Sequence, residues 1–435
     1  MATGSAMRGI DRSFEPGFAP ALPGRPAGIG GRLRERPEDF LVEEIPLYEP
    51  SGEGEHIYLF VEKRGMSTME MVGLIARHFG VRRRDVGYAG LKDKRAITRQ
   101  LVSVWAPKLR IEDVPMLSHD RVAILWADRH GNKLRPGHLK SNRFSIRVRG
   151  VAFHAAVHAQ RVLARLAREG LPNRIGEQRF GYLANNHLVG RALVLGRWAE
   201  AVELLLGPDG AHPDAQPEGR RLFREGRHAE ALAHFHESLR TEREMLRALA
   251  SGATPQEAVR RMDRSVAAYY VTAFQSALFN AVLNRREADG TLGVLVEGDI
   301  AFMHASRATF VVGPAELSDP EMPGRLARFE VSPSGPMWGT SMRRAGGAVG
   351  SLELGVLEAS GSTEADLLSF EREGGAVEGA RRPLRVPVID PDVEGGADEH
   401  GGYVRCAFEL PRGSFATSVM REIMGAGGPI HDEEE

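Results

Sequence analysis

The chain has 435 residues, of which 42% are hydrophobic, and its 57 basic residues nearly balance its 58 acidic ones. This hydrophobic content is enough for a packed core and too high for a disordered chain, and the single cysteine excludes a disulfide scaffold and a cysteine-based zinc site. No apolar run approaches the roughly 20 residues that span a bilayer, and the N-terminus lacks an apolar signal core, so we expect a cytoplasmic protein without a membrane segment.

The near-zero net charge conceals an uneven distribution of the basic residues. Only six of them are lysines, and all six lie between residues 63 and 140. Residues 63–150 carry 20 basic and 7 acidic side chains, a net charge of +13, whereas residues 1–62 sum to −5 and residues 151–435 to −9. Such a cationic segment predicts a polyanionic partner.

The first elements in chain order are predicted from capping and periodicity. Residues 1–27 show no periodicity and are expected to form a disordered tail. Ser67-Thr-Met-Glu70 is a capping-box pattern that opens a helix, which Gly80 ends. Apolar runs and period-2 alternation predict four strands: 55–61, 101–105, 122–126 and 144–148. Of these, 101–105 and 122–126 are expected to be buried.

The second half of the chain is predicted to be more helical. Helical periodicity covers 151–169, helices broken by a polar loop follow over 199–262, and a long helix covers 265–286. An acidic, glycine-rich linker is expected over 390–402, followed by a strand over 404–410 and a helix over 414–424. Because this late strand resembles the early ones, we predict four regions: a tail, 1–27; a catalytic domain in two parts, 28–198 and 383–435; and an inserted domain, 199–382.

The densest polar cluster is the run from Gly87 to Gln100, in which Asp93 lies between Lys92 and Lys94. Flanking cations keep a carboxylate ionised and attract phosphate. A carboxylate on such a turn suits a nucleophile or base directed at a nucleic acid, although a solvated charged turn has the same pattern. Lysine and arginine are not interchangeable, and two lysines beside this aspartate in an arginine-rich chain favour a functional role.

Three further segments combine aromatic and polar side chains. Asn173 and the run 178–181 could read and stack on a base, or form a loop with capping amides. The run 37–40 could place Phe40 near a site, or form a strand-entry turn. The run 411–421 offers a helix N-terminus that suits an anion, and is equally consistent with an ordinary capped helix.

Patterns for metals and nucleotide cofactors are weak or missing. The histidine pairs 154/158 and 234/236 have no third ligand at a recognisable spacing. The chain contains neither the Gly-x-x-x-x-Gly-Lys-Ser/Thr pattern of phosphate-binding loops nor a Gly-x-Gly-x-x-Gly run after a predicted strand. We therefore predict no cofactor and no metal. Cys406 lies on the apolar face of a predicted strand and is expected in the core.

The run from Gly87 to Gln100 resembles the signature of the TruD family of tRNA pseudouridine synthases. Further blocks resemble the same family in the same order, and an ordered set of this kind is more specific than one motif. Together they extend from about residue 30 to 425: 37–43, 52–56, 137–142, 172–181, 276–280, 298–299 and 413–422.

The resemblance implies an α+β fold, in which a pseudouridine-synthase catalytic domain with a mixed, largely antiparallel sheet and helices is interrupted by an inserted, family-specific α/β domain. It implies isomerisation of a uridine in tRNA, classically at position 13, by a monomer that needs no cofactor. Asp93 falls on the catalytic aspartate. The resemblance places Phe40, Asn173 and Phe415 at the target nucleotide. We expect contacts with RNA phosphates from Lys92, Lys94, Lys140 and Arg179. For Lys92 and Lys140, a contact with Asp93 is the alternative.

One departure from the family pattern concerns Ile175, where the family often has an aromatic residue, so base stacking would depend more on Phe40 and Phe415. The sequence leaves open whether Asp93 attacks the sugar or the base, or removes the 2′ proton. Two alternatives in other classes remain: a non-catalytic RNA-binding protein or tRNA chaperone on the same scaffold, and an N-glycosidase that uses the carboxylate for hydrolysis.

Overall fold

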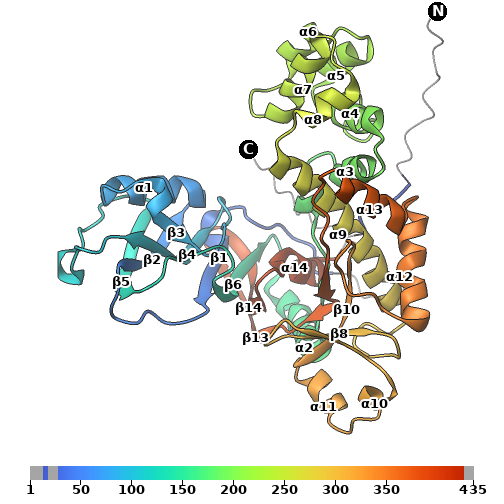
Figure 1. Ribbon diagram of the computed structural model, residues 1–435. Coiled ribbons are helices and arrows are strands. Elements are labelled where there is room, and N and C mark those ends of the chain that lie inside the picture. Colours follow the sequence, from blue (N-terminus) through green and yellow to red (C-terminus); the bar gives the residue numbers. More distant parts are fainter. Residues whose placement is uncertain (1–12, 18–27, 426–435) are drawn as a thin grey trace, which may run out of the picture. The chain divides into compact units, whose positions relative to one another are not determined.

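The computed structural model describes residues 13–17 and 28–425 (Figure 1). The chain forms two compact units. Unit 1 contains Pro172–Arg385 together with residues 13–17, and unit 2 contains the described residues of Pro23–Leu171 and Val386–His431. The chain thus leaves unit 2 after Leu171 and returns to it at Val386.

Unit 2 is built on an eight-stranded sheet with the order β13-β14-β6-β1-β4-β2-β5, in which β3 also pairs with β4. The pair β1–β4 is parallel and the other pairs are antiparallel, so the predicted mixed, largely antiparallel sheet is confirmed. The strands are β1 (Phe40–Pro46), β2 (His56–Arg64), β3 (Val86–Tyr88), β4 (Ile97–Trp105), β5 (Val122–His130), β6 (Leu139–Arg149), β13 (Ile389–Asp398) and β14 (Gly401–Pro411).

Three helices cover this sheet: α1 (Thr68–His78), α2 (Ala156–Glu169) and α14 (Ala416–Met424). The predicted capping box of α1 is confirmed, since the Ser67 hydroxyl accepts a hydrogen bond from the Glu70 amide at 3.2 Å and the Glu70 carboxylate accepts one from the Ser67 amide at 2.8 Å. Buried apolar side chains of α1 pack on β2 and β4, while α2 and α14 pack on β6 and β14 around the buried Cys406. Cys406 is therefore a core residue, as predicted.

Two segments of unit 2 differ from the predictions. Strand β5 is an edge strand and not a buried one, because it pairs only with β2 and leaves Leu125 and Trp126 46% and 39% exposed. Residues 390–402 form no linker: they belong to β13 and its turn into β14. Their acidic side chains pair with arginines of β6 and β14, Asp398 with Arg149 at 2.6 Å and Glu394 with Arg405 at 2.8 Å.

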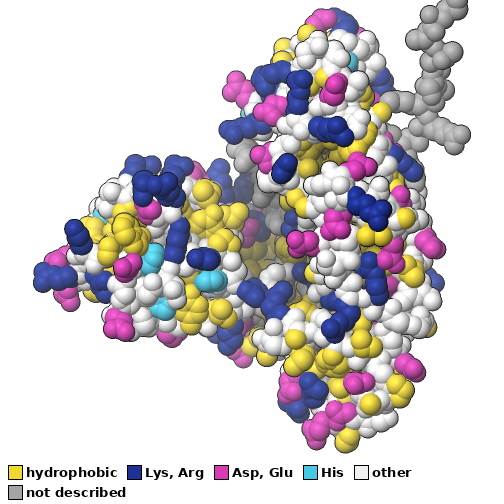
Figure 2. Space-filling model, in the orientation of Figure 1, with side chains coloured by type: hydrophobic (Ala, Val, Ile, Leu, Met, Phe, Trp, Pro, Cys, Tyr) yellow, Lys and Arg dark blue, Asp and Glu magenta, His cyan; other side chains and the backbone are white. Residues whose placement is uncertain are grey.

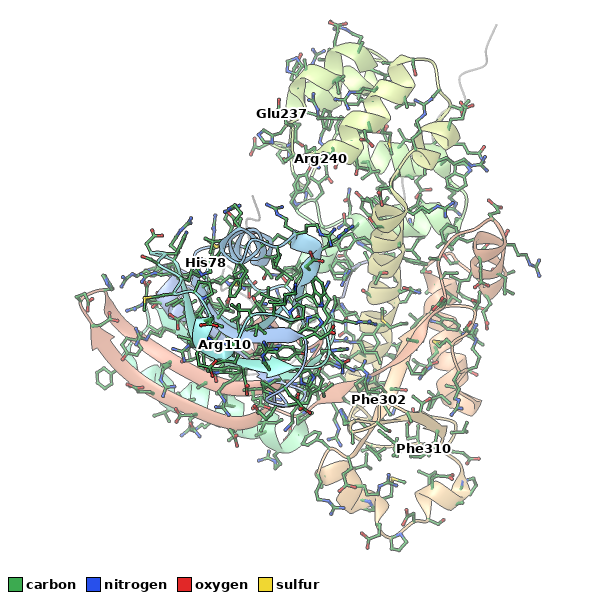
Figure 3. The ribbon with its side chains drawn as sticks, turned by 60° about the vertical axis from the view of Figure 1, so that its left-hand side comes forward. His78, Arg110, Glu237, Arg240, Phe302 and Phe310 are labelled. Atoms are coloured by element: carbon green, nitrogen blue, oxygen red, sulfur yellow. The ribbon has the colours of Figure 1, made fainter. Side chains whose placement is uncertain are left out.

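Unit 1 combines a helical part with the four-stranded sheet β11-β10-β8-β9. Figure 3 shows Phe302 and Phe310 on the strand pair β8–β9 and Glu237 and Arg240 at the other end of the unit, in its helical part. The strands are β8 (Ile300–Met303), β9 (Thr309–Val311), β10 (Val331–Met337) and β11 (Ala380–Pro383). The helices are α3 (Asn186–Val194), α4 (Trp198–Leu206), α5 (Pro217–Arg224), α6 (His228–Ala231), α7 (Arg240–Ala250), α8 (Pro255–Arg260), α9 (Arg264–Ala288), α10 (Pro314–Leu317), α11 (Met322–Ala327), α12 (Gly347–Ala359) and α13 (Glu364–Arg372).

Helix α9 is the central helix of unit 1. By length and composition alone it could cross a membrane, but 67% of its apolar window is buried inside the molecule, as in the core helix of a globular unit. Helix α3 packs against it so closely that a Cβ on Gly190 would lie 2.0 Å from the Tyr270 carbonyl oxygen. This contact explains why unit 1 begins at Pro172 and includes α3, ahead of the predicted boundary at 199.

Residues 13–17 fall within the predicted tail, yet they pack on unit 1. The Phe14 ring lies 6.1 Å from the Phe274 ring, and the carbonyl oxygens of Pro16 and Gly17 accept hydrogen bonds from the side-chain amides of Asn280 and Asn284 at 2.9 and 2.8 Å. The other residues of the predicted tail lie outside the described residues.

Candidate active site

Asp93 lies in the loop between β3 and β4, and its side chain is 37% exposed. Arg34 Nη2 lies 3.4 Å from Asp93 Oδ1. The guanidinium of the same arginine lies 4.4 Å from the centroid of the Phe40 ring, which is a cation–π contact. Arg34 thus links two residues that the resemblance places in the site, and it covers Phe40, which is buried. No sequence motif had pointed to Arg34.

A buried lysine holds the backbone of this loop. The Lys63 ammonium donates hydrogen bonds to the carbonyl oxygens of Met66 at 2.6 Å and of Asp93 at 2.8 Å. Burial lowers the pKa of Lys63 to about 8, and the charge of Asp93 opposes this shift. Lys63 follows Ile57, Leu59 and Val61 on the inward face of β2. The sequence does show that this lysine continues the alternation of the apolar residues that face the core, which could have indicated its burial. Our sequence analysis assigned it no role.

Lys92, which directly precedes Asp93 in the loop, is engaged with residues of β1 and β6. Its ammonium forms an ion pair with Glu44 Oε2 at 2.8 Å and donates to Asn142 Oδ1 at 2.6 Å. Burial raises the pKa of Glu44, and the Lys92 charge opposes that shift. Because a buried carboxylate needs a countercharge, Lys92 neutralises Glu44, and its side chain is only 6% exposed. In this structure Lys92 is therefore engaged with Glu44 and Asn142, and its contact with an RNA phosphate or with Asp93 stays a prediction.

Two polar side chains of neighbouring elements complete the anchoring of the loop. The hydroxyl of Thr68 at the start of α1 accepts a hydrogen bond from the Lys92 amide at 2.9 Å. The Gln100 amide of β4 donates to the Gly90 carbonyl at 3.2 Å and accepts from the Thr68 hydroxyl at 3.3 Å. With Lys63 of β2, three elements therefore fix the backbone of residues 90–93, while the Asp93 carboxylate stays partly exposed.

The other predicted residues of unit 2 lie on neighbouring loops. Lys94 and Lys140 are exposed. The Gly137 amide donates to the Ala89 carbonyl at 2.7 Å, and the Arg412 amide donates to the Lys140 carbonyl at 3.3 Å. These bonds join the Asp93 loop to the start of β6, and the start of β6 to the turn that leads to the half-buried Phe415 at the N-terminus of α14.

Asn173 and Arg179 belong to unit 1. The Asn173 side chain is only 4% exposed, donates to the Pro383 carbonyl at 2.9 Å and accepts from Arg382 Nη2 at 2.6 Å. Its amide thus ties the chain after β7 (Leu171–Pro172) to β11. The Arg179 guanidinium lies 4.9 Å from the centroid of the Tyr269 ring. Ile175 is buried and offers no stacking surface.

The described part of the chain offers no candidate metal site. Residues 13–17 and 28–425 contain no group of three or more His, Cys, Asp or Glu side chains that could hold an ion. The arrangement around Asp93 instead presents one accessible carboxylate on an immobilised backbone with exposed cations nearby. Such a group can act as a nucleophile or as a general base.

Comparison with known proteins agrees with this fold. The model of the family "tRNA pseudouridine synthase D (TruD)" matches residues 24–423. The proteins named tRNA pseudouridine synthase D from Geobacter metallireducens and Geobacter sulfurreducens are each 44% identical, over 405 and 409 residues; the alignments cover 92% of this chain and 96% and 95% of the relatives. A crystal structure assigned to TruD of Methanosarcina mazei is similar with a TM-score of 0.80 and 27% identity, over 95% of this chain and 98% of that one.

Together the fold and these matches define a pseudouridine synthase, an enzyme of the isomerase class. More specifically, the chain belongs to the tRNA pseudouridine synthase D (TruD) family. The resemblance seen in the ordered sequence blocks is thereby confirmed.

Proposed function

We propose that this enzyme isomerises the uridine at position 13 of tRNA to pseudouridine and that Asp93 is its catalytic carboxylate. Family membership supports the reaction and the tRNA substrate. One observation supports the role of Asp93: its carboxylate is partly exposed, whereas the backbone of its loop is held in place by hydrogen bonds with Lys63, Thr68 and Gln100.

The reaction rearranges bonds within one nucleotide. The C1′–N1 bond breaks, the base rotates, and a C1′–C5 bond forms; the proton on C5 is lost and N1 gains one, so no atoms are gained or lost overall. One carboxylate can serve this sequence, either by attack or by removing a proton, without a redox partner. We therefore include action without cofactor or metal, by a monomer in the cytoplasm, in the proposal.

The nucleotide must leave its stack before the carboxylate can reach it, which costs a few kcal/mol that aromatic stacking partly offsets. We assign this contact to Phe415 and to Phe40, which becomes accessible when Arg34 moves off its ring. The exposed Lys94 and Lys140 suit the RNA phosphates. Asn173 and Arg179 stay as proposed RNA contacts on unit 1.

The first prediction tests Asp93 directly. Replacement Asp93→Asn keeps the size of the side chain and removes its charge and basicity, so we expect pseudouridine formation to fall by about 10³-fold or more while tRNA affinity changes little. Pseudouridine is mapped position by position in tRNA, and affinity is measured in parallel. The matched control is Asp120→Asn, an aspartate of unit 2 whose side chain is 83% exposed, which keeps full activity.

Each alternative has a distinct outcome in the same experiment. Near-normal isomerisation by Asp93→Asn overturns the role of Asp93. Tight tRNA binding by the unmodified enzyme without any pseudouridine indicates a non-catalytic binding protein, and release of free uracil indicates a glycosidase. If pseudouridine forms in a tRNA whose uridine 13 is replaced by cytidine, the proposed position is wrong.

A further inference from the structure

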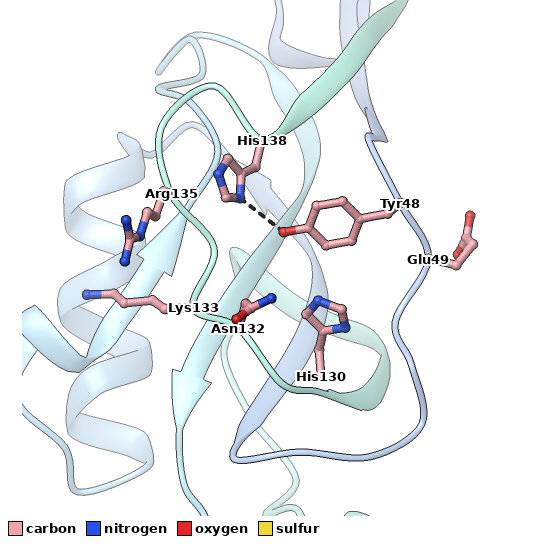
Figure 4. A pocket seen from close by; sticks show the side chains of 7 residues that line it. All are labelled: Tyr48, Glu49, His130, Asn132, Lys133, Arg135 and His138. Carbon is pink, nitrogen blue, oxygen red and sulfur yellow. Dashed lines mark hydrogen bonds between the residues drawn. The ribbon is translucent and has the colours of Figure 1, made fainter.

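A cavity in unit 2 lies outside the Asp93 loop (Figure 4). Its volume is about 570 Å³, within the range of roughly 300–1,000 Å³ of small-molecule sites. The segment between β1 and β2, the end of β5 and the loop between β5 and β6 supply the residues that line it, namely Tyr48, Glu49, His130, Asn132, Lys133, Arg135 and His138.

One side of this pocket is aromatic. The Tyr48 and His130 rings are stacked with centroids 5.0 Å apart and an angle of 24°, and Tyr58 lies beneath His130 at 4.7 Å. The Tyr48 hydroxyl and His138 Nδ1 form a hydrogen bond of 3.0 Å. Flat aromatic groups of this kind suit the face of a nucleobase, which stacks on them regardless of its identity.

The other side is cationic. Figure 4 shows Lys133 and Arg135 side by side across the pocket from Tyr48, with the amide of Asn132 between the two sides. The Lys133 ammonium donates to the Arg84 carbonyl, which places it beside the exposed arginines 82–84. The only carboxylate of the lining, Glu49, points away from the other side chains in Figure 4. Figure 2 shows histidine and basic side chains close together on the β2–β5 part of unit 2.

The pocket is held in place by contacts beneath it. The buried Tyr58 hydroxyl donates to the Asn132 carbonyl at 3.0 Å, and the buried Ser103 hydroxyl accepts from the Leu134 amide at 2.9 Å. Gly87 permits this packing, because a Cβ there would lie 2.3 Å from the Leu134 carbonyl oxygen. The loop that carries Asn132, Lys133 and Arg135 is therefore preorganised by β2, β3 and β4.

We propose that this pocket binds one nucleotide of the RNA substrate other than the target uridine, with its base against Tyr48 and its phosphate on Lys133 and Arg135. The inference rests on the proposed function for the identity of the RNA. The bond from the Gly137 amide to the Ala89 carbonyl ties the pocket loop to the loop of Asp93. A nucleotide held here fixes how the RNA lies on unit 2 and thereby positions the target uridine.

The test measures tRNA binding in the Asp93→Asn background, so that bound RNA is not converted. We expect Arg135→Ala to reduce the slope of log affinity against log salt by about 0.7–0.9, the value for one lost phosphate contact. Tyr48→Ala is expected to weaken binding about 5- to 150-fold, the range for one lost base stack, whereas Tyr48→Phe keeps the ring and binds like the parent within a few-fold.

The matched control is Arg161→Ala, an exposed arginine of α2 on the same unit, which leaves affinity and salt slope unchanged. Thermal unfolding of each variant separates loss of the fold from loss of the site, and the exposed Arg135 is decisive if Tyr48→Ala unfolds. Parent-like affinity and salt slope in Arg135→Ala overturn the proposal. Failure of the proposed function is seen separately, as absence of pseudouridine with the unmodified enzyme.

Discussion

The ammonium of Lys63 is the clearest case of a single residue that positions the site. It reaches three carbonyl oxygens, those of Met66, Asp93 and Lys92, the last at 3.4 Å. Replacement Lys63→Met removes these bonds at nearly constant length. Because a displacement of about 1 Å can cost 10²-fold in rate, we expect kcat to fall roughly 10- to 100-fold while tRNA affinity stays near normal. The exposed Lys108 supplies the control Lys108→Met, with unchanged kcat.

The pH dependence of the free energy of unfolding shows whether Lys63 acts as a buried ammonium or only through packing. The pKa of Lys63 is lowered from 10.5 to about 8 in the folded protein. Between these values the unfolded chain binds more protons than the folded one, so the free energy of unfolding gains a term that rises with pH. Urea unfolding of the wild type relative to Lys63→Met therefore shows an advantage that grows from about pH 8 to 10.5, and a constant difference would contradict the assignment.

Sequence reasoning singled out the proposed catalytic residue, Asp93, and missed what surrounds it. Asp93 could be singled out because charge and spacing are local in the sequence. The partner of Lys92 could not be known, since Glu44 lies on another strand and only the sheet register brings them together. Arg34 meets Asp93 although the two residues are also far apart in the sequence. Long-range pairs of this kind leave no trace in a local pattern.

At the scale of elements, one buried arginine of β6 links the segment before β1 to the edge strand β13. Arg149 pairs with the buried Asp39 at 2.6 Å and with Asp398 of β13 at 2.6 Å. Asp39 directly precedes Phe40 in the chain. Arg149→Met leaves the Asp39 carboxylate buried without a partner, so we expect a loss of about 3–5 kcal/mol in the free energy of unfolding.

The neighbouring Arg147 provides the matched comparison. It lies on the same strand, two residues away, is 34% exposed, and pairs with Asp398 at 3.6 Å. An exposed pair contributes about 0–1 kcal/mol, so Arg147→Met should cost less than about 1 kcal/mol. Urea unfolding of both variants tests this difference. Equal losses in the free energy of unfolding would show that the burial of the ion pair does not determine its contribution.

The elements that were predicted correctly have a clear local signal. The alternation over 144–148 gives the inward face of β6, with Phe144, Ile146 and Val148 buried, and the capping box gives the start of α1. The prediction failed for β13, because glycines and acidic residues are typical of linkers. There the strand depends on its hydrogen bonds with β14 and on arginine partners, which composition does not reveal.

At the scale of the whole molecule, the connection between the two units is short and ordered. The chain leaves unit 2 at β7 and returns at β12 (Arg385–Val386), and these two strands pair with each other. The ends of unit 2 therefore lie next to each other at the crossing. Sequence similarity between early and late strands suggested an insertion, but the crossing itself depends on this two-residue pairing, which is too short for a pattern to predict.

This arrangement predicts that unit 2 folds without unit 1. Each of the hydrophobic clusters among the described residues has its members in one unit: those around Cys406, Ile57 and Tyr58 lie in unit 2, and the others in unit 1. Since a unit with its own core can fold alone, a chain that joins Leu171 to Val386 through a few glycines should unfold cooperatively in urea. It should also keep a salt-dependent affinity for tRNA, because it retains residues 63–150 with their net charge of +13.

The same shortened chain separates binding from catalysis, since it retains Asp93 and the Tyr48 pocket but lacks Asn173 and Arg179. We expect it to bind tRNA with reduced affinity and to form no detectable pseudouridine, measured by mapping at saturating protein. The full-length Asp93→Asn variant is the reference for binding without turnover. If the shortened chain shows no cooperative transition, the independence of its core is wrong; if it forms pseudouridine at the normal rate, unit 1 contributes nothing to the chemical step.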